Sequence, residues 1–284
     1  MAIIQNYLTK NPCYNAGRTI KVKGLMLHSV GCPQPNPEVF IKAWNKESYN
    51  ASCVHGCIGD QDAYITLPIL ETPGTAFRGW HGGKGSKGSV NDTHIGIEMC
   101  EPGCIKYISG PVYYGATISC SDYAAAQKFV EKVTRNAVVL FAKLCKFHNL
   151  NPLEDGVIIS HNEGGKRGIA SAHVDPDHLW PQLKMDYNMN KFRQDVYEEL
   201  QRLNKEEEEE MDVTRFKQLW YEMRLDLQDN DAGSWSKEAR DWAVNTGLVQ
   251  GTSDGEFNGA WEDLLTREQL VTVLYRFAKM MGKV

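Results

Sequence analysis

Two histidines and one aspartate lie at the ends of predicted strands or in a loop that follows one, where a catalytic metal site would need them. His28 ends the apolar run 22–28, His161 follows the run 157–160, and Asp175 lies in a His-Val-Asp-Pro segment. Two imidazoles and one carboxylate form a ligand set of catalytic zinc, which keeps a fourth position for water. These residue types therefore predict a metal centre.

One acid, Glu98, stands alone in the apolar strand predicted around 95–100. A carboxylate among buried hydrophobic side chains is costly unless it is paired or takes part in a reaction. Beside the ligand set, it predicts metal-assisted hydrolysis. Cys53, His55 and Cys57 alternate along another strand and offer a second metal site. That alternative is weaker, because three ligands so close in one strand rarely complete a tetrahedron.

The elements that must position these residues alternate between strands and helices over residues 20–200. Short apolar runs predict the strands, while Pro37 and either Ser121 or Asp122 mark helix starts. The predicted strands are 22–28, 53–58, 64–67, 95–100 and 157–160, and the predicted helices are 37–46 and 121–148. This order predicts an α/β domain with a mixed central sheet flanked by helices and a site at strand ends.

The composition is that of an ordinary globular protein, with 42% hydrophobic residues and a net charge of −5. Nucleic-acid binding would need a basic patch, and no apolar run is long enough to span a bilayer. The first ten residues lack the features of a secretion signal. We therefore expect a cytoplasmic chain whose eight cysteines are mostly reduced and buried.

An acidic run divides the sequence into two domains. Residues 201–212 include five consecutive glutamates and almost nothing apolar, which predicts an extended linker. Residues 1–200 then form the catalytic domain and residues 213–284 a small all-helical module. The purine-rich glutamate codons before Met211 also suggest an internal ribosome-binding site. Free modules beginning at Met211 are thus a hypothesis beside that of a plain charged spacer.

The motifs of the first domain together resemble the type 2 N-acetylmuramoyl-L-alanine amidases. This family includes phage endolysins, bacterial autolysins and peptidoglycan recognition proteins. The resemblance covers residues 20–195. It is carried by Leu27-His28-Ser29, Ala51-Ser-Cys-Val-His55, Gly79-Trp-His81-Gly-Gly83, Ile95-Gly-Ile-Glu98, Ser160-His161 and His173-Val-Asp-Pro176.

The resemblance implies a zinc ion held by His28, His161 and Asp175. Zinc acidifies the water that it binds, and Glu98 would take the proton and return it to the leaving amine. The bond cleaved would be the amide between N-acetylmuramic acid and L-alanine in peptidoglycan. His173 lies where relatives carry a residue thought to stabilise the oxyanion. In the alternative, His173 is the third ligand and Asp175 supports it from behind.

Four further residues are assigned to the substrate side of the site. His55, Trp80 and His81 match positions that line the cleft in the family. Arg167 lies in a loop that is longer than in relatives, where a guanidinium could hold a stem-peptide carboxylate. The alternatives are a core role for the first three and a solvated loop for Arg167. His178 is expected to face solvent or to cap a turn.

The C-terminal module resembles an S-layer homology motif. Such motifs bind secondary cell-wall polymers, and the Thr266-Arg267 pair implies Arg267 near an acidic sugar. The family normally groups three copies, and this chain has one, so either chains associate as a homo-oligomer or the copy makes a different contact. The resemblance is carried by residues 235–243, 247–251, 254–257 and 265–269.

These features predict a zinc-dependent peptidoglycan amidase with a wall-binding tail, of the phage or prophage endolysin kind, which waits in the cytoplasm until host lysis. One alternative is a recognition protein that binds wall fragments without cutting them, and another is a cytosolic amidase that recycles such fragments. The retained ligand set and Glu98 argue against the first. The wall-binding resemblance argues against the second.

Overall fold

A mixed sheet of six strands forms the centre of the first of two compact units, Met1–Lys205. The computed structural model describes residues 1–109, 116–210, 213–228, 231–251 and 259–284. The order across the sheet is β1 (Ala2–Gln5), β5 (Asp62–Ile65), β4 (Gly56–Ile58), β7 (His94–Met99), β3 (Gly24–Ser29) and β10 (Ile158–Ser160). Strands β4 and β5 are antiparallel, and the other neighbours are parallel. The predicted α/β fold is confirmed.

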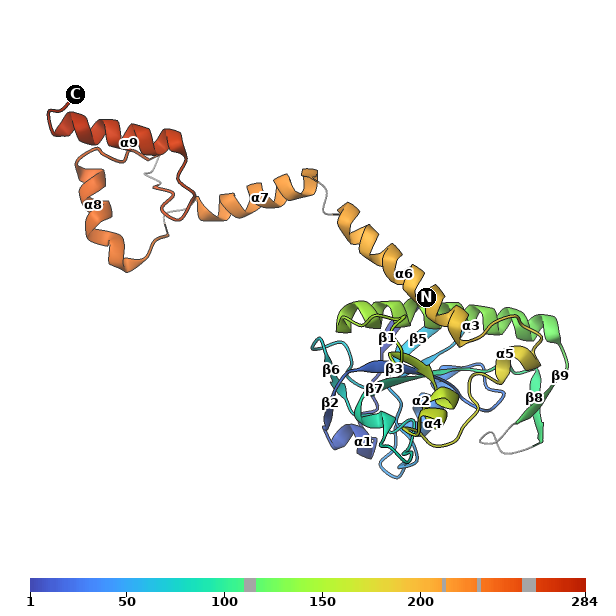
Figure 1. Cartoon of the computed structure of the whole chain (residues 1–284). Coiled ribbons are helices and arrows are strands. Elements are labelled where there is room, and N and C mark those ends of the chain that lie inside the picture. Colours follow the sequence, from blue (N-terminus) through green and yellow to red (C-terminus); the bar gives the residue numbers. More distant parts are fainter. Residues whose placement is uncertain (110–115, 211–212, 229–230, 252–258) are drawn as a thin grey trace. The chain divides into compact units, whose positions relative to one another are not determined.

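Helices cover both faces of this sheet (Figure 1). The long helix α3 (Tyr123–His148) crosses one face, and α2 (Pro37–Trp44) and α4 (His161–Arg167) lie on the other. Side chains alternate along β3, so Leu25 and Leu27 join the core under α3. Met26 packs in the cluster on the opposite face. His28, in phase with Met26, therefore faces the side of α2 and α4.

Helix α3 begins and ends as its sequence indicates. The Asp122 carboxylate accepts a hydrogen bond from the Ala125 N–H at 2.9 Å, which caps the first turn. Asn149 ends the helix in the left-handed region, with φ 54°. The apolar stripe between these caps, which includes Val130, Ala137 and Phe141, is buried against the sheet.

The segment after His161 is a helix and not the loop that the sequence predicted. Ser160 Oγ accepts the Glu163 N–H at 3.0 Å, and a Glu163 carboxylate oxygen accepts the Ser160 N–H at 3.0 Å. This reciprocal capping box starts α4, so His161 lies in a rigid first turn. The Ser-x-x-Glu spacing was visible in the sequence, but Gly164 and Gly165 lower the helix propensity behind it.

Two small sheets and several short helices complete the first unit. Strand β2 (Thr19–Lys21) pairs with β6 (Thr75–Phe77), and β8 (Ile105–Ser109) pairs with β9 (Thr117–Cys120). Both pairs are antiparallel. The short helices are α1 (Pro12–Asn15), η1 (Val90–Asp92) and α5 (Leu179–Gln182).

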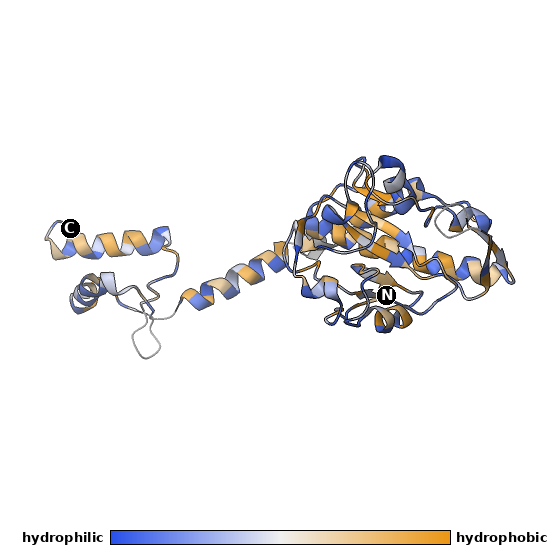
Figure 2. Cartoon of the chain, turned by 90° about the horizontal axis from the view of Figure 1, so that it is seen from below, coloured by the Kyte–Doolittle hydropathy of each residue, from blue (hydrophilic) through white to orange (hydrophobic). Residues whose placement is uncertain are grey.

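The second unit, Glu206–Val284, is helical in the part that is described. The acidic run is not extended as predicted, because α6 (Met189–Glu210) continues through it, and glutamate is a good helix former. The later helices are α7 (Val213–Leu227), η2 (Ser234–Ser236), α8 (Lys237–Asn245) and α9 (Arg267–Met280). Apolar and polar residues alternate along α9 (Figure 2). Met211 and residues 254–257 lie outside the described residues.

Candidate metal centre and active site

The structure brings His28, His161 and Asp175 together in one buried group. One ligand atom from each lies within 4.8 Å of the others. The two Nδ1 atoms are 3.1 Å apart, and Asp175 Oδ2 lies 3.3 Å from His28 Nδ1. Asp175 Oδ1 lies 3.5 Å from His161 Nδ1. The ends of β3 and β10 meet here, so strand pairing delivers both histidines.

A chain of hydrogen bonds assigns the proton of His28 to its Nε2 atom. His81 Nε2 donates to the His94 carbonyl oxygen at 3.0 Å, which leaves His81 Nδ1 as an acceptor. His28 Nε2 lies 3.0 Å from that acceptor and must donate to it. His28 Nδ1 therefore carries no proton and directs a lone pair at the group. Gly96 makes room for this chain, since a Cβ there would lie 2.2 Å from His81 Nδ1.

Hydrogen bonds likewise assign the proton of His161 to its Nε2 atom. The Ser171 hydroxyl donates to the Gly82 carbonyl at 3.1 Å, so its oxygen accepts from His161 Nε2 at 3.2 Å. His161 Nδ1 is then unprotonated as well. Two bare nitrogens that face each other at 3.1 Å cannot hydrogen-bond, and a cation between them removes the conflict. Tetrahedral zinc with ligand bonds near 2.1 Å would separate its ligand atoms by about 3.4 Å, close to the observed distances of 3.1, 3.3 and 3.5 Å.

The charges of the group also suit a cation. Burial lowers the pKa of His28 to about 4, so the ring is neutral at neutral pH. The Asp175 carboxylate lies 3.3 Å from His28 Nδ1 and 3.5 Å from His161 Nδ1, and these bare nitrogens cannot donate to it, so its charge is stable there only beside a cation. Asp175 Oδ1 is buried and accepts no hydrogen bond from the described residues. Two neutral imidazoles and one ionised carboxylate therefore offer free lone pairs to a metal.

Glu98 lies beside this group. It is the register partner of His28 on the adjacent parallel strand β7, so both side chains leave the sheet on the same face. Its Oε2 atom is buried and has no hydrogen-bond partner among the described residues. Burial, and next the charge of Asp175, raise the pKa of Glu98 well above its usual range. A carboxyl group with a raised pKa can both accept and donate a proton near neutral pH.

His173 lies at the open side of the group. Its ring stacks on His161 with centroids 3.9 Å apart, and its Nδ1 lies 3.4 Å from Asp175 Oδ1. The side chain is 23% exposed, in contrast to the buried Asp175. The group that can hold a metal contains Asp175 and not His173. Asp175 thus belongs to the candidate metal group, and His173 lies beside it at the more exposed side.

The group opens into a cleft of about 630 Å³. Trp80, His81 and His173 line it together with Glu98 and the ligands. Neither His55 nor Arg167 is among the described residues that line it. The Arg167 guanidinium pairs with Asp155 at the surface.

Three aromatic residues that line the cleft were not assigned to the site from the sequence: Phe40, Trp44 and Tyr49. The first two belong to α2, where helical spacing indicates only a buried face. Their rings lie 5.2 Å apart, and both border the cleft. Periodicity cannot separate a side chain that packs in the core from one at the rim of a cleft. His178 is buried and does not face solvent, but it lies at a turn, as the other alternative expected, where it precedes α5.

His55 is a buried neutral histidine behind the cleft. Its Nε2 donates to the Phe77 carbonyl at 2.8 Å, and its Nδ1 accepts the Gly96 N–H at 2.9 Å. All eight cysteines lie in the described part of the chain and are free thiols, five of them buried. Among the described residues, the one group able to hold a metal is that of His28, so the Cys53–His55–Cys57 alternative finds no support.

Acid is expected to destabilise the protein through His55. Burial lowers the pKa of His55 to about 4, below the 6.5 of an exposed ring, so the unfolded chain binds more protons between these values. The contribution of His55 to the free energy of unfolding is therefore complete above pH 6.5. It falls by about 3 kcal/mol as the pH falls toward 4. Urea unfolding of metal-free wild type and His55→Gln at pH 4 to 7 measures this.

The quantity to compare is the difference in the free energy of unfolding between wild type and His55→Gln at each pH. This difference is needed because Glu101 changes the free energy of unfolding with the opposite sign. Burial raises the pKa of Glu101 to about 7, so this group stabilises the fold as the pH falls. The His55→Gln protein retains that contribution. Parallel curves for the two proteins would contradict the assignment of His55 as a neutral buried group.

A family model and several solved structures match this chain. The model of the N-acetylmuramoyl-L-alanine amidase family matches residues 18–178, more than half of the chain. The crystal structure of Staphylococcus aureus hydrolase AmiA in complex with its ligand aligns with a TM-score of 0.50 at 16% identity, over 70% of this chain and 83% of that one. It is similar in fold.

Two further solved structures align less closely. The catalytic domain of XlyA aligns with a TM-score of 0.48 at 19% identity, over 69% of this chain and 99% of that one. A mutant endolysin from Bacillus subtilis aligns with a TM-score of 0.45 at 21% identity, over 69% and 99% of the two chains. No curated protein matches the sequence. In the described part of the chain, no helix is long and apolar enough to cross a membrane.

Proposed function

Because this chain belongs to the N-acetylmuramoyl-L-alanine amidase family, we propose that it cleaves the amide between N-acetylmuramic acid and L-alanine with a zinc ion held by His28, His161 and Asp175. It is a peptidoglycan amidase by family. The zinc ion and the role of each residue are the steps beyond that membership.

One observation carries the proposal. The hydrogen bonds of His81 and Ser171 leave both ligand histidines with bare Nδ1 atoms, 3.1 Å apart and beside an ionised carboxylate. Such a group is electrostatically incomplete without a cation. Imidazole and carboxylate ligands at these spacings suit zinc.

Each residue around the proposed zinc ion has a separate role in hydrolysis. Bound zinc would supply a Lewis acid that polarises the scissile carbonyl and acidifies water. Glu98 takes the proton from the attacking water and passes it to the leaving amine of L-alanine. The His173 imidazole, on the open side of the group, donates to the oxygen that gains negative charge. His81 and Ser171 keep the ligand rings oriented.

Digestion of purified Gram-positive cell walls tests this function. We expect new L-alanine amino termini without new reducing sugar ends, and loss of the activity after chelation and its return with added zinc. Wall binding without bond cleavage would support the alternative of a recognition protein. New reducing ends would indicate a glycosidase and contradict the proposal.

We also propose that the second unit binds a secondary cell-wall polymer through Arg267. Thr266 caps α9 through a reciprocal capping box with Gln269, so Arg267 lies exposed in the first helical turn. We expect Arg267→Ala to lower sedimentation of the protein with purified walls by about tenfold, the loss of one charge-assisted hydrogen bond. Lys279→Ala, in the last turn of the same helix, is the control. Equal binding by both variants would contradict the role of Arg267.

The helices of this unit further suggest association with another copy. Helix α7 buries none of its residues within the described chain, and Phe216 is 58% exposed. An apolar stripe with alternating spacings of three and four residues, as in coiled coils, runs along it: Val213, Phe216, Trp220, Met223 and Leu227. The proposed partner is a second chain or a fragment beginning at Met211. Sedimentation and mass spectrometry of wild type and Met211→Leu test both forms, and a monomer in both would contradict them.

The combination of a wall amidase with a wall-binding unit supports a role as a phage or prophage endolysin. In this proposal the chain stays in the cytoplasm until the membrane is opened. Its expression in a Gram-positive host should leave the culture turbid until a permeabilising agent is added. Lysis without that agent would contradict the proposed localisation.

A further inference from the structure

A partly buried chain of hydrogen bonds beside the candidate metal group runs through Glu101, Tyr107 and His178. The Tyr107 hydroxyl donates to Glu101 Oε2 at 2.8 Å. Because that hydrogen is used, the Tyr107 oxygen accepts from His178 Nε2 at 2.9 Å. Glu101 is fully buried and His178 is 9% exposed. None of the three is needed for the chemistry described above.

Both ends of this chain reach segments that carry site residues. At one end, Glu101 Oε1 accepts the Gly31 N–H at 3.0 Å, three residues after His28. Glu101 itself follows Glu98 by three residues. At the other end, His178 closes a tight turn that starts before Asp175, since its N–H donates to the Val174 carbonyl at 3.2 Å. These hydrogen bonds therefore connect the loop after β3 to the turn that presents Asp175.

The far side of that turn is tied to α4. Ser160 Oγ donates to Asp177 Oδ2 at 2.7 Å, and the Asn162 N–H donates to the Asp175 carbonyl at 3.2 Å. These bonds join the turn to the segment that holds His161. Toward His28 and Glu98, the turn is held by one long bond from the Ser29 N–H to Asp175 Oδ2, at 3.4 Å, and by the hydrogen bonds of His178. A short turn held on one side only could shift, and metal sites lose affinity when a ligand shifts.

We propose that Glu101, Tyr107 and His178 are positioning residues that set the distance of Asp175 from His28 and Glu98. They touch neither metal nor substrate. Their hydrogen bonds lock the Asp175 turn against the loop after β3, so that the three ligand atoms keep the spacing observed. This inference rests on the proposed zinc site and adds to it the part of the fold that sets its geometry.

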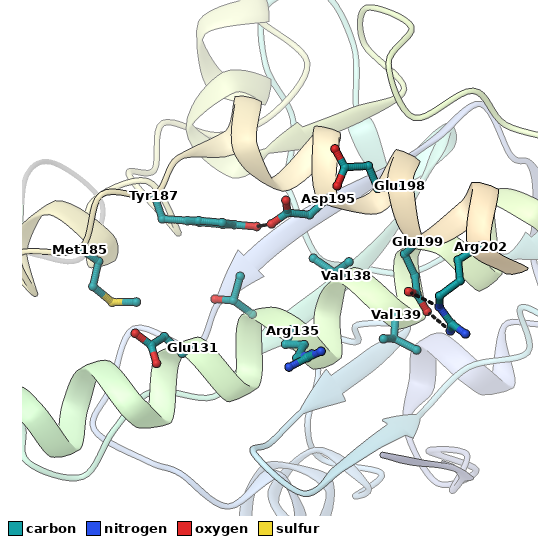
Figure 3. A pocket seen from close by; sticks show the side chains of 11 residues that line it. Glu131, Arg135, Val138, Val139, Met185, Tyr187, Asp195, Glu198, Glu199 and Arg202 are labelled. Carbon is teal, nitrogen blue, oxygen red and sulfur yellow. Dashed lines mark hydrogen bonds and ion pairs between the residues drawn. The ribbon is translucent and has the colours of Figure 1, made fainter.

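Tyr107→Phe is the direct test, because it removes one hydroxyl, and with it both hydrogen bonds, at nearly constant volume. We expect the zinc dissociation constant of the folded protein, measured by competition with a chromogenic chelator, to rise on the order of tenfold. Tyr187→Phe is the matched control. The Tyr187 hydroxyl donates to Asp195 at 2.6 Å in a separate hollow between α3 and α6 (Figure 3). Its loss should leave zinc affinity unchanged.

A second pair of variants separates positioning from stability. His178→Gln can keep an N–H near the place of Nε2 and should restore most of the affinity that His178→Ala loses. The thermal midpoint of each metal-free protein is measured in parallel. A lower midpoint with unchanged zinc affinity in Tyr107→Phe and His178→Ala would overturn the proposal. A wild-type protein that binds no zinc would instead overturn the proposed function.

Discussion

Glu98→Gln is expected to lower kcat for wall hydrolysis by about 10²- to 10⁴-fold, the usual contribution of a general acid–base group. Glutamine keeps the size of the side chain but cannot exchange a proton with water or the leaving amine. Burial already raises the pKa of Glu98, so the neutral amide removes a desolvation cost. The variant should therefore be at least as stable as the wild type and should bind zinc equally well.

The measurement combines steady-state release of amino termini with zinc content and thermal midpoint. Glu154→Gln, at an exposed position of the same unit, is the control for a lost negative charge. If Glu98→Gln retained most of the wild-type kcat, another group would have to carry the proton. A loss of zinc together with the rate would assign Glu98 to the metal and not to the proton.

Asp175→Asn and His173→Asn are expected to separate the metal ligand from the group that acts on substrate. Asp175→Asn removes the negative ligand and should weaken zinc binding by more than about 100-fold, beyond the loss caused by an outer partner. His173→Asn should retain zinc and lower kcat by about 10²- to 10³-fold, as for an oxyanion donor. Asp175→Asn conserves the shape of the side chain, and His173→Asn removes the outer part of the imidazole ring.

Equilibrium dialysis with metal analysis measures the first effect, and wall hydrolysis at saturating zinc measures the second. Ser171→Ala is a useful comparison, because it removes the acceptor of His161 Nε2 and should cause only the smaller, outer-partner loss of affinity. The reverse pattern, with zinc lost in His173→Asn and kept in Asp175→Asn, would make His173 the third ligand.

Local patterns in the sequence predicted much of the first unit. The strands around 22–28, 95–100 and 157–160 and the helix up to His148 follow from apolar periodicity and caps, which act over a few residues. Helix α4 escaped prediction although Ser160 and Glu163 have capping-box spacing, since the glycines after them favour a loop. The helix through the acidic run was not predicted either, because charge repulsion argues for an extended chain. In the structure its backbone continues α6.

Some site residues could be identified from the sequence, and the positions of others could not. The sequence singled out His28, His161 and Glu98 as polar residues at the ends or middle of apolar strands, and Asp175 as an acid before a proline, and the structure brings the two histidines and Asp175 together. The position of His55 behind the cleft and the pairing of Arg167 with Asp155 were not predictable from spacing. Each depends on a partner distant in the chain or on a surface contact that no periodic pattern encodes.

The sequence by itself determined the ligand types, the lone acid and the strands that carry them, because these depend on residue identity and on short-range backbone preference. Only the tertiary structure decided which nitrogen of each histidine faces the proposed metal site, since the acceptors His81 and Ser171 are set by folding. It alone joined His28 to Asp175, 147 residues away, and His178 to Tyr107 across 71 residues. The physical reason is that hydrogen-bond partners are chosen by packing in three dimensions, while sequence spacing constrains only neighbours along the chain.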